Sequence, residues 1–316
     1  MAGGWYIGID VSKDSLEVAF GCDGEVRQVA NADRAIMALA AELKELGPQL
    51  VVMEASGGYE RMVAALLWEA DLPVVVANPS QVRDFAKGLG QYAKTDRQDA
   101  RIIARWAEVK QPPVRRLPDA QGRELSELLR RRRQLLEMLV AERQRLAQTV
   151  SKPIRKELNA SIASLQRRLE RIEAEIEQRI RKSELWNRTR ELLESVPGVG
   201  KLTSFMLVAE LPELGTSDRR HLASLVGVAP YPRDSGKWHR PRLTHGGRAA
   251  VRSALYMAAL SAARCNPVLA PFYQRLLGRG AAKKQALVAV IRRLLGILNA
   301  IVRDRIPWRL SCAVPV

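Results

Sequence analysis

Four acidic residues have the types and spacing that a divalent-cation site needs, each at a predicted strand end or in the first turn of a predicted helix: Asp10, Glu54, Asp96 and Asp99. Asp96 and Asp99 are three residues apart, which places both carboxylates on one helix face, where they repel unless a cation lies between them. Carboxylate oxygens suit Mg²⁺ or Mn²⁺, and two such ions about 3.5 to 4 Å apart can hold the attacking and leaving oxygens of a phosphodiester. The four acids therefore predict Mg²⁺-dependent chemistry on phosphodiesters, with Mn²⁺ as a substitute.

Each acid also has a purely structural interpretation. Asp10 could cap a turn, Glu54 could be a solvated strand end, and Asp96 could join Thr95 in capping a helix and complementing its dipole. For any one acid taken alone, the structural interpretation is the commoner one. The combination of four favours a metal site.

A basic segment near the C-terminus offers a second kind of chemistry. Residues 231–252 are predicted to form a loop in which Asp234 is the only acid. Trp238 could stack on an unpaired base, and six cations could line a phosphate path: Arg233, Lys237, Arg240, Arg242, Arg248 and Arg252. Among these cations the hydroxyl of Ser235 could attack phosphorus, because its alkoxide would be stabilised. A Ser-Gly pair in a loop is far more often an ordinary turn, so the residues alone leave this a weak hypothesis.

The segment Val196-Pro-Gly-Val-Gly-Lys-Leu resembles the turn of a helix-hairpin-helix element. Gly198 and Gly200 permit a tight turn, and the backbone N–H groups that follow, beside Lys201, could contact a phosphate. Such a contact would be independent of base sequence. Glycine-rich turns between helices are also common in purely structural settings.

Composition favours a folded protein with a polyanionic partner. The 316 residues are 47% hydrophobic, enough for two domains with real cores, and the net charge is +17 with a pI near 10.3. The charge is uneven: residues 1–115 carry a net −3, residues 116–185 carry +6 and residues 186–316 carry +14. The segment that bears the carboxylates is therefore not the main contact with the polyanion.

Cysteine usage and hydropathy predict a cytoplasmic protein with no membrane partner. Cys22, Cys265 and Cys312 lack the paired spacing of a zinc site or a disulfide framework. The most apolar late segment, residues 286–302, is interrupted by two arginines, and the N-terminus has no signal-peptide pattern.

The periodicity predicts an α/β domain followed by helices. Apolar runs predict strands and amphipathic runs predict helices in this order: strands 5–11, 16–20, helix 34–46, strand 50–54, helix 60–70 and strand 73–77. Prolines near residue 115 mark a boundary, so we predict domains at 1–115, 116–185 and 186–316.

The middle domain has the pattern of a coiled coil. Apolar residues recur at spacings of four and three: Leu158, Ile162, Leu165, Leu169, Ile172, Ile176 and Ile180. A second periodic helix precedes them. An antiparallel hairpin within one chain and a dimerisation arm are equally compatible with this seam, since a heptad pattern does not name its partner.

Taken together, the motifs resemble one known family over nearly the whole chain. They are Gly8-Ile-Asp-Val-Ser-Lys, Glu54-Ala-Ser-Gly-Gly-Tyr-Glu, Asn78-Pro-Ser-Gln-Val-Arg, Ala93-Lys-Thr-Asp-Arg-Gln-Asp-Ala, Val196-Pro-Gly-Val-Gly and Gly227-Val-Ala-Pro-Tyr-Pro-Arg-Asp-Ser-Gly. This order is similar to that of the DEDD transposases of bacterial insertion sequences, in the insertion sequence one-ten family and its one-one-one-one subgroup, to which the Piv-type DNA invertases are related.

The resemblance implies more than the spacing does. It implies an N-terminal RuvC-like (RNase H-type) domain, a coiled-coil insertion and a mostly helical C-terminal transposase domain. It also implies that Asp10, Glu54, Asp96 and Asp99 hold Mg²⁺, and that Ser235 forms a covalent phosphoserine link to DNA. Dimers that pair into tetramers would assemble with donor and target DNA around a noncoding bridge RNA.

Two other classes of function remain compatible with the residues. A RuvC-like Holliday-junction endonuclease would use a metal-activated water and would not need Ser235. A non-catalytic nucleic-acid-binding protein would need only the basic C-terminal segment.

Overall fold

Alternating apolar residues near the N-terminus pair into one mixed β-sheet. The computed structural model describes residues 5–91, 95–114, 120–235 and 238–309. The strands are β1 (Tyr6–Val11), β2 (Ser15–Phe20), β3 (Val26–Ala30), β4 (Leu50–Glu54) and β5 (Val74–Ala77), in the order β3-β2-β1-β4-β5. Strand β2 runs antiparallel to both of its neighbours, β1 and β3, whereas β4 and β5 run parallel to β1. The carboxyl ends of β1 and β4 therefore meet at one edge of the sheet.

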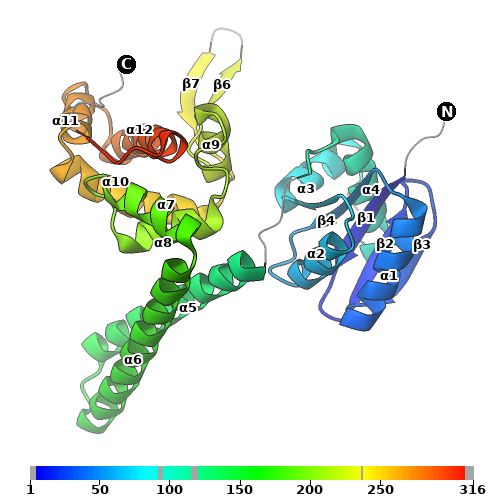
Figure 1. The fold of residues 1–316 in the computed structure, drawn as a ribbon, viewed down its shortest axis with the longest axis horizontal. Coiled ribbons are helices and arrows are strands. Elements are labelled where there is room, and N and C mark those ends of the chain that lie inside the picture. Colours follow the sequence, from blue (N-terminus) through cyan, green and yellow to red (C-terminus); the bar gives the residue numbers. More distant parts are fainter. Residues whose placement is uncertain (1–4, 92–94, 115–119, 236–237, 310–316) are drawn as a thin grey trace. The chain divides into compact units, whose positions relative to one another are not determined.

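Helices cover both faces of this sheet (Figure 1). Ile7, Ile9 and Met53 pack against α1 (Asp33–Leu46) and α2 (Glu60–Glu69), whereas Leu50 and Val52 pack against α3 (Pro79–Gly88) and α4 (Asp96–Lys110). Because successive strand residues alternate between faces, even-numbered residues of β1 and β4 point toward α4. The first unit, Met1–Pro118, is thus α/β, as the sequence predicts.

A long helical hairpin opens the second unit, Asp119–Val316. It consists of α5 (Ala120–Gln148) and α6 (Lys152–Lys182), and α6 has Pro153 in its first turn, where proline is tolerated. Leu135 and Leu139 contact Ile162 and Leu165, whereas residues nearer the start of α5 contact residues nearer the end of α6. The helices are therefore antiparallel, and the predicted heptad seam packs on its own chain.

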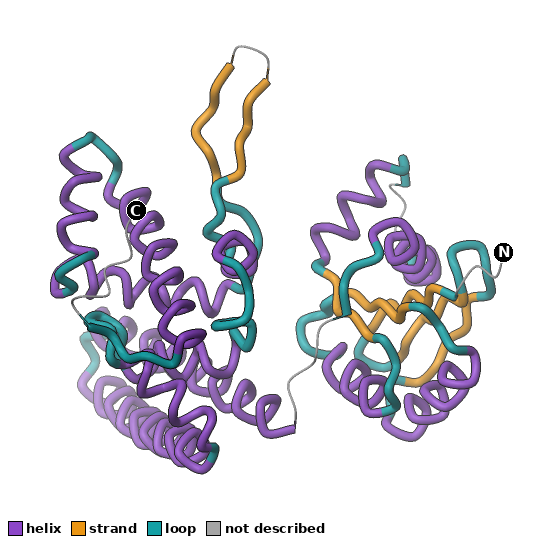
Figure 2. Tube along the Cα trace, turned by 45° about the horizontal axis from the view of Figure 1, so that its top comes forward, coloured by secondary structure: helices purple, strands orange, loops and turns teal. Residues whose placement is uncertain are grey.

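The remaining residues form a helical body with one β-hairpin (Figure 2). Its helices are α7 (Glu184–Glu194), α8 (Lys201–Glu210), α9 (Arg219–Val226), α10 (Ala249–Cys265), α11 (Leu269–Gly278) and α12 (Lys283–Asp304). Helix α12 is long and apolar enough to cross a membrane by length and composition, but Val290, Leu294 and Leu298 lie in the core of this unit. The second unit is mostly helical, as the sequence predicts.

The hairpin replaces part of the predicted basic loop. Strands β6 (Tyr231–Ser235) and β7 (Trp238–Leu243) pair antiparallel, with a register irregularity between Tyr231 and Arg233. Both strands contain a proline, which removes a ladder donor and is tolerated in a two-stranded ribbon whose edges are open. The composition therefore suggests a loop where the backbone forms strands.

Candidate functional site

Asp10 lies near the carboxyl end of the central strand β1. Its neighbours Ile9 and Val11 are buried on the face that carries α1 and α2, so Asp10 points to the opposite face, toward α4. Gly8 lies on this same face and allows the helix to approach, because a Cβ at Gly8 would lie 2.2 Å from the carbonyl oxygen of Ala100. Because Gly8 has no side chain, α4 can pack directly against β1, the strand that carries Asp10.

Asp96 and Asp99 belong to the first turn of α4. The helix begins after Thr95, whose hydroxyl accepts a hydrogen bond from the backbone N–H of Gln98 at 3.4 Å. Two carboxylates in a first turn are favoured by the partial positive charge of the helix N-terminus. Further along the helix, Ala100 and Ala104 pack on the sheet and fix the position of this turn.

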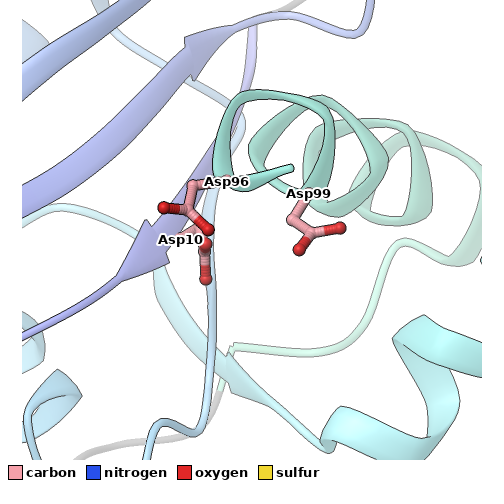
Figure 3. A group of neighbouring side chains, drawn as sticks. All are labelled: Asp10, Asp96 and Asp99. Carbon is pink, nitrogen blue, oxygen red and sulfur yellow. The ribbon is translucent and has the colours of Figure 1, made fainter. Parts of the chain in front are cut away.

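The three aspartates converge at the edge of the sheet (Figure 3). One carboxylate oxygen from each of Asp10, Asp96 and Asp99 lies within 4.8 Å of the others. Asp96 is exposed, and the other two are partly buried. Two oxygens on opposite sides of a Mg²⁺ ion are ~4.2 Å apart, so three hard oxygen donors within 4.8 Å of one another need only a small side-chain adjustment to hold such a cation. The side chains also leave one side of the group open to solvent through Asp96.

Glu54 ends β4, the strand next to β1. Ile9 pairs with Met53, so Glu54 follows one step later in the register, beside Asp10. Leu50 and Val52 pack toward α4, and Glu54 shares their face by alternation. The group of three aspartates does not include Glu54. The structure thus places all four predicted acids at one sheet edge and brings three of them together; their roles stay predictions.

Two acidic residues that the sequence does not single out lie next to predicted site residues, one beside Asp10 and one that binds the loop after Glu54. The first is Glu17 of β2, which is the cross-strand partner of Asp10 and is only 8% exposed. Its Oε2 lies 3.8 Å from Nε of Arg97, the residue that follows Asp96. A glutamate in a strand of alternating apolar and polar residues is usually expected to face solvent. The pairing of β1 with β2 is the signal that would have identified Glu17, because it places Glu17 opposite Asp10.

The second is Glu60, which organises the loop that follows Glu54. It is buried, and its Oε2 accepts hydrogen bonds from Ser56 N at 3.0 Å, Ser56 Oγ at 3.1 Å and Gly58 N at 2.8 Å. Burial opposes ionisation of Glu60, but the backbone and hydroxyl hydrogen bonds outweigh it and lower the pKa of this carboxyl. The resulting loop geometry holds the chain between β4 and α2.

Ser235 is the last residue of β6, and it pairs with Trp238 of β7. Arg233 pairs with Arg240, so two positively charged residues occupy opposing positions in the ladder. Arg242 also belongs to β7, whereas Lys237 lies outside the described residues. The hairpin thus gathers several of the predicted phosphate-binding residues and the candidate nucleophile on one short ribbon.

The predicted helix-hairpin-helix turn joins α7 to α8. Gly198 has φ = 101°, and a Cβ there would lie 2.6 Å from the backbone of Ala262, so this glycine permits close packing on α10. Gly200 immediately precedes α8, and a Cβ there would meet no atom within 4 Å. Lys201 donates to Glu177 Oε2 at 2.6 Å, and this bond lowers the pKa of Glu177. Lys201 is therefore already paired with a carboxylate of α6.

Arg248 is also engaged within the protein. Its guanidinium donates to both carboxylate oxygens of Glu213 at 2.6 Å and to the carbonyl of Glu210 at 2.9 Å. A bidentate pair of this kind orients both side chains. Arg248 therefore links the end of α8 to the start of α10. Its contact with nucleic acid stays a prediction.

Comparisons with known proteins point to DNA rearrangement. A transposase family model matches residues 7–152, and a model of the IS116/IS110/IS902 transposase family matches residues 190–274. The chain is 28% identical to the pilin gene-inverting protein of Moraxella bovis over 313 residues, which are 96% of this chain and 97% of that protein. It is 34% identical to the insertion element IS900 protein of Mycobacterium paratuberculosis over 169 residues, 51% of this chain and 39% of the other. It is 36% identical to the insertion element IS116 protein of Streptomyces clavuligerus over 120 residues, 36% of this chain and 29% of the other. The first model spans the four acids, and the second spans Ser235.

Proposed function

Because the chain belongs to the IS116/IS110/IS902 family of transposases, we propose that it excises and inserts its own mobile element by cutting and rejoining DNA through a phosphoserine intermediate. The observation that carries this proposal is the group of Asp10, Asp96 and Asp99, whose oxygens lie within 4.8 Å of one another. A mixed sheet with the first acid on its central strand supports assignment of the first unit to the RuvC-like class. A role for Glu54 as the fourth acid follows from its register position beside Asp10.

The donor set fits a hard divalent cation, which we propose is Mg²⁺, with Mn²⁺ as a substitute. Such a cation, when bound, neutralises charge on phosphate oxygens and lowers the barrier to displacement at phosphorus. Asp10, Glu54, Asp96 and Asp99 would hold this cation. They do not need to deprotonate a water molecule if the nucleophile is a protein hydroxyl.

Ser235 supplies that hydroxyl in our proposal. Its oxygen bonds to phosphorus as the bond from phosphorus to one deoxyribose oxygen breaks, and the proton of the serine hydroxyl ends on the released sugar hydroxyl. A second DNA hydroxyl then attacks the phosphoserine, restores a phosphodiester and regenerates the serine. No bond energy is lost to water, which allows rejoining without an external energy source.

The basic second unit provides the surface for nucleic acid in this proposal. Residues 186–316 carry a net +14, and the β6–β7 hairpin holds four of the predicted nucleic-acid-binding positions and Ser235 in its described residues. Guidance by a noncoding bridge RNA, assembly of the chain into dimers and tetramers, and action in the bacterial cytoplasm on nucleoid DNA complete the proposal.

Trapping the covalent adduct tests the serine step directly. Full-length protein would be incubated with its noncoding RNA, labelled element-end DNA and Mg²⁺, and then denatured so that only covalent protein–DNA species retain the label. The wild-type chain should form a labelled adduct at Ser235, identified by peptide mass, and Ser235→Ala should form none. A labelled adduct of undiminished yield in Ser235→Ala would show that another group is the nucleophile.

Variants of the acids separate the remaining alternatives. Asp10→Asn and Asp99→Asn should bind DNA as the wild type does but should lose both cleavage and adduct formation. Cleavage without any adduct, retained in Ser235→Ala, would instead indicate hydrolysis by a metal-activated water. Activity that persists in both aspartate variants would contradict the metal role.

A further inference from the structure

Glu17 is a nearly buried carboxylate beside the aspartate group. It pairs with Asp10 across the β1–β2 ladder, and paired residues of adjacent strands share a face. Ala19, two residues further on, packs against Ala100 and Ala104, which places Glu17 on the α4 side of the sheet as well. Within the described part of the chain, Glu17 Oε2 is buried and accepts no hydrogen bond. A carboxylate in this position is unfavourable unless a nearby cation compensates its charge.

Arg97 is the cation that approaches this carboxylate. Its Nε lies 3.8 Å from Glu17 Oε2, and its side chain is 71% exposed while that of Glu17 is 10% exposed. The pair joins β2 to the first turn of α4, the same turn that carries Asp96 and Asp99. Arg101, one helical turn later, donates to the carbonyl of Gly24 at 3.2 Å and follows the same side of the helix. The side chain of Arg97 thus extends toward β2.

Arg97 lies between Asp96 and Asp99 in the sequence, so the direction of its side chain determines whether it can reach their carboxylates. It follows Asp96 directly and precedes Asp99 by two residues, so its long side chain starts beside the carboxylate group. A guanidinium carries five N–H donors in a planar arrangement that matches carboxylates. An unrestrained Arg97 could therefore bind the aspartates and compete with a divalent cation for them.

We propose that Glu17 restrains Arg97 against β2 and thereby keeps the Asp10, Asp96 and Asp99 group available to a divalent cation. Glu17 is a positioning residue in this inference, because it acts through Arg97. The inference rests on the proposed metal role of the aspartates and adds a residue that controls cation affinity.

A double-mutant cycle on metal binding tests this inference. Mn²⁺ binding by the full-length chain would be followed by the electron paramagnetic resonance of free Mn²⁺, without DNA, for the wild type, Glu17→Gln, Arg97→Gln and the double variant. Glu17→Gln should weaken Mn²⁺ binding about tenfold, as is common when a residue supporting metal ligands is removed. Arg97→Gln should bind at least as tightly as the wild type, and the double variant should return to within about threefold of Arg97→Gln.

The cycle distinguishes restraint from a direct effect of charge. If Glu17 attracted the metal only by its own charge, Glu17→Gln would weaken binding by the same factor whether or not Arg97 is present, and the inference would be overturned. Glu17→Asp gives a second comparison, because it retains the charge beside Asp10 but shortens the reach toward Arg97. Weakened binding in Glu17→Asp supports restraint, whereas wild-type affinity contradicts it.

Two reference variants complete the design. Glu45→Gln removes one exposed charge from α1, on the opposite face of the sheet, and should leave Mn²⁺ affinity unchanged. Asp10→Asn should lose most binding. If the wild type and Asp10→Asn bind Mn²⁺ with the same affinity, the proposed metal role of the aspartates is wrong. If Asp10→Asn loses Mn²⁺ binding but the effects of Glu17→Gln and Arg97→Gln on affinity are additive, only the proposed role of Glu17 is wrong.

Discussion

Gly8 of β1 and Ala100 of α4 lie so close that no side chain fits between them. A Cβ at Gly8 would lie 2.2 Å from the carbonyl oxygen of Ala100 and 2.4 Å from the backbone nitrogen of Ala104. Backbone atoms cannot move aside as a flexible side chain can. This close approach sets the height of α4 above the strand that carries Asp10, and so it helps to determine the spacing of the aspartates.

Gly8→Ala should therefore damage both stability and metal binding. The added methyl group must push α4 away from the sheet, and we expect a loss of about 2–3 kcal/mol in the free energy of unfolding. Urea unfolding followed by circular dichroism measures the loss. The same displacement separates Asp96 and Asp99 from Asp10 and should weaken Mn²⁺ binding.

Gly88 provides a matched control for this substitution. It lies at the end of α3, and a Cβ there would meet no atom within 4 Å. Gly88→Ala should change the free energy of unfolding by less than about 1 kcal/mol and should favour the helix. Equal losses in the two variants would show that the close approach of Gly8 and α4 does not constrain the fold.

Asp10→Asn should remove the stabilisation of the protein by divalent metal ions. The substitution removes one of the three anionic oxygen donors that lie within 4.8 Å of one another and so weakens the hold on a divalent cation. Saturating Mg²⁺ should stabilise the wild type by about 1–3 kcal/mol and should not stabilise the variant.

Thermal unfolding with a chelator and then with millimolar Mg²⁺ measures this stabilisation. Ca²⁺-free buffers are needed, since any divalent cation with oxygen preference could bind the same group. A wild-type protein whose melting temperature does not respond to Mg²⁺ or Mn²⁺ would count against the site.

Much of the framework can be predicted from the sequence because its signals are local. The apolar runs that end in Asp10 and Glu54 form β1 and β4, and the heptad seam forms α6. Strand β3 is not predicted from the sequence. Its residues, Val26–Ala30, are only partly buried, as is usual for an edge strand, so they lack a clear apolar pattern. The strand forms because a short connection lets it pair with β2. The β6–β7 hairpin has the composition of a loop because prolines and arginines dominate it.

The candidate site can be predicted in its residue types but not in its geometry. Strand ends and the helix turn have local signals, which is why Asp10, Asp96 and Asp99 stand out as candidates. Glu17 does not, because its position depends on the pairing of β2 with β1, and a strand glutamate ordinarily faces solvent. Arg248 is predicted to bind phosphate, but no local signal indicates that Glu213, 35 residues away in sequence, pairs with it.

Glu60 should make the stability of the first unit depend on acid pH. Its folded-state pKa is lowered, because hydrogen bonds from Ser56 and Gly58 outweigh the effect of burial. Ionised Glu60 therefore contributes stability that is complete above the usual pKa of a glutamate. This contribution is lost as the pH falls below that range and through the lowered pKa of the folded state.

Glu60→Gln should reduce the free energy of unfolding at neutral pH by about 1–3 kcal/mol, since donors in the loop lose a charged acceptor. Between neutral pH and mild acid, the wild type should lose more stability than the variant. Urea unfolding at a series of pH values measures the difference. Glu42→Gln removes a carboxylate that pairs with Arg27 at the surface and should have an effect below about 1 kcal/mol. Parallel pH profiles for the wild type and Glu60→Gln would contradict the assignment.

Substituting Arg248 and Arg240 should distinguish an arginine that stabilises the fold from one that binds nucleic acid. Arg248→Ala leaves Glu213 without its bidentate partner, and because the pair is only partly exposed we expect a loss of about 2 kcal/mol in the free energy of unfolding. Its effect on the salt dependence of DNA binding should be small, since the guanidinium is already engaged. Arg240→Ala, in the hairpin, should leave stability unchanged and should reduce the slope of log affinity against log salt by about one.

Fluorescence anisotropy with labelled duplex DNA over a series of salt concentrations measures the slopes, and urea unfolding measures the stabilities. The two arginines are matched in charge and both lie in the basic segment, so net charge alone predicts equal slopes. A reduced slope for Arg248→Ala with unchanged stability would show that Arg248 leaves Glu213 to bind phosphate. An unchanged slope for Arg240→Ala would remove this arginine from the DNA-binding surface, because a cation that neutralises a DNA phosphate releases counterions and so contributes to the slope.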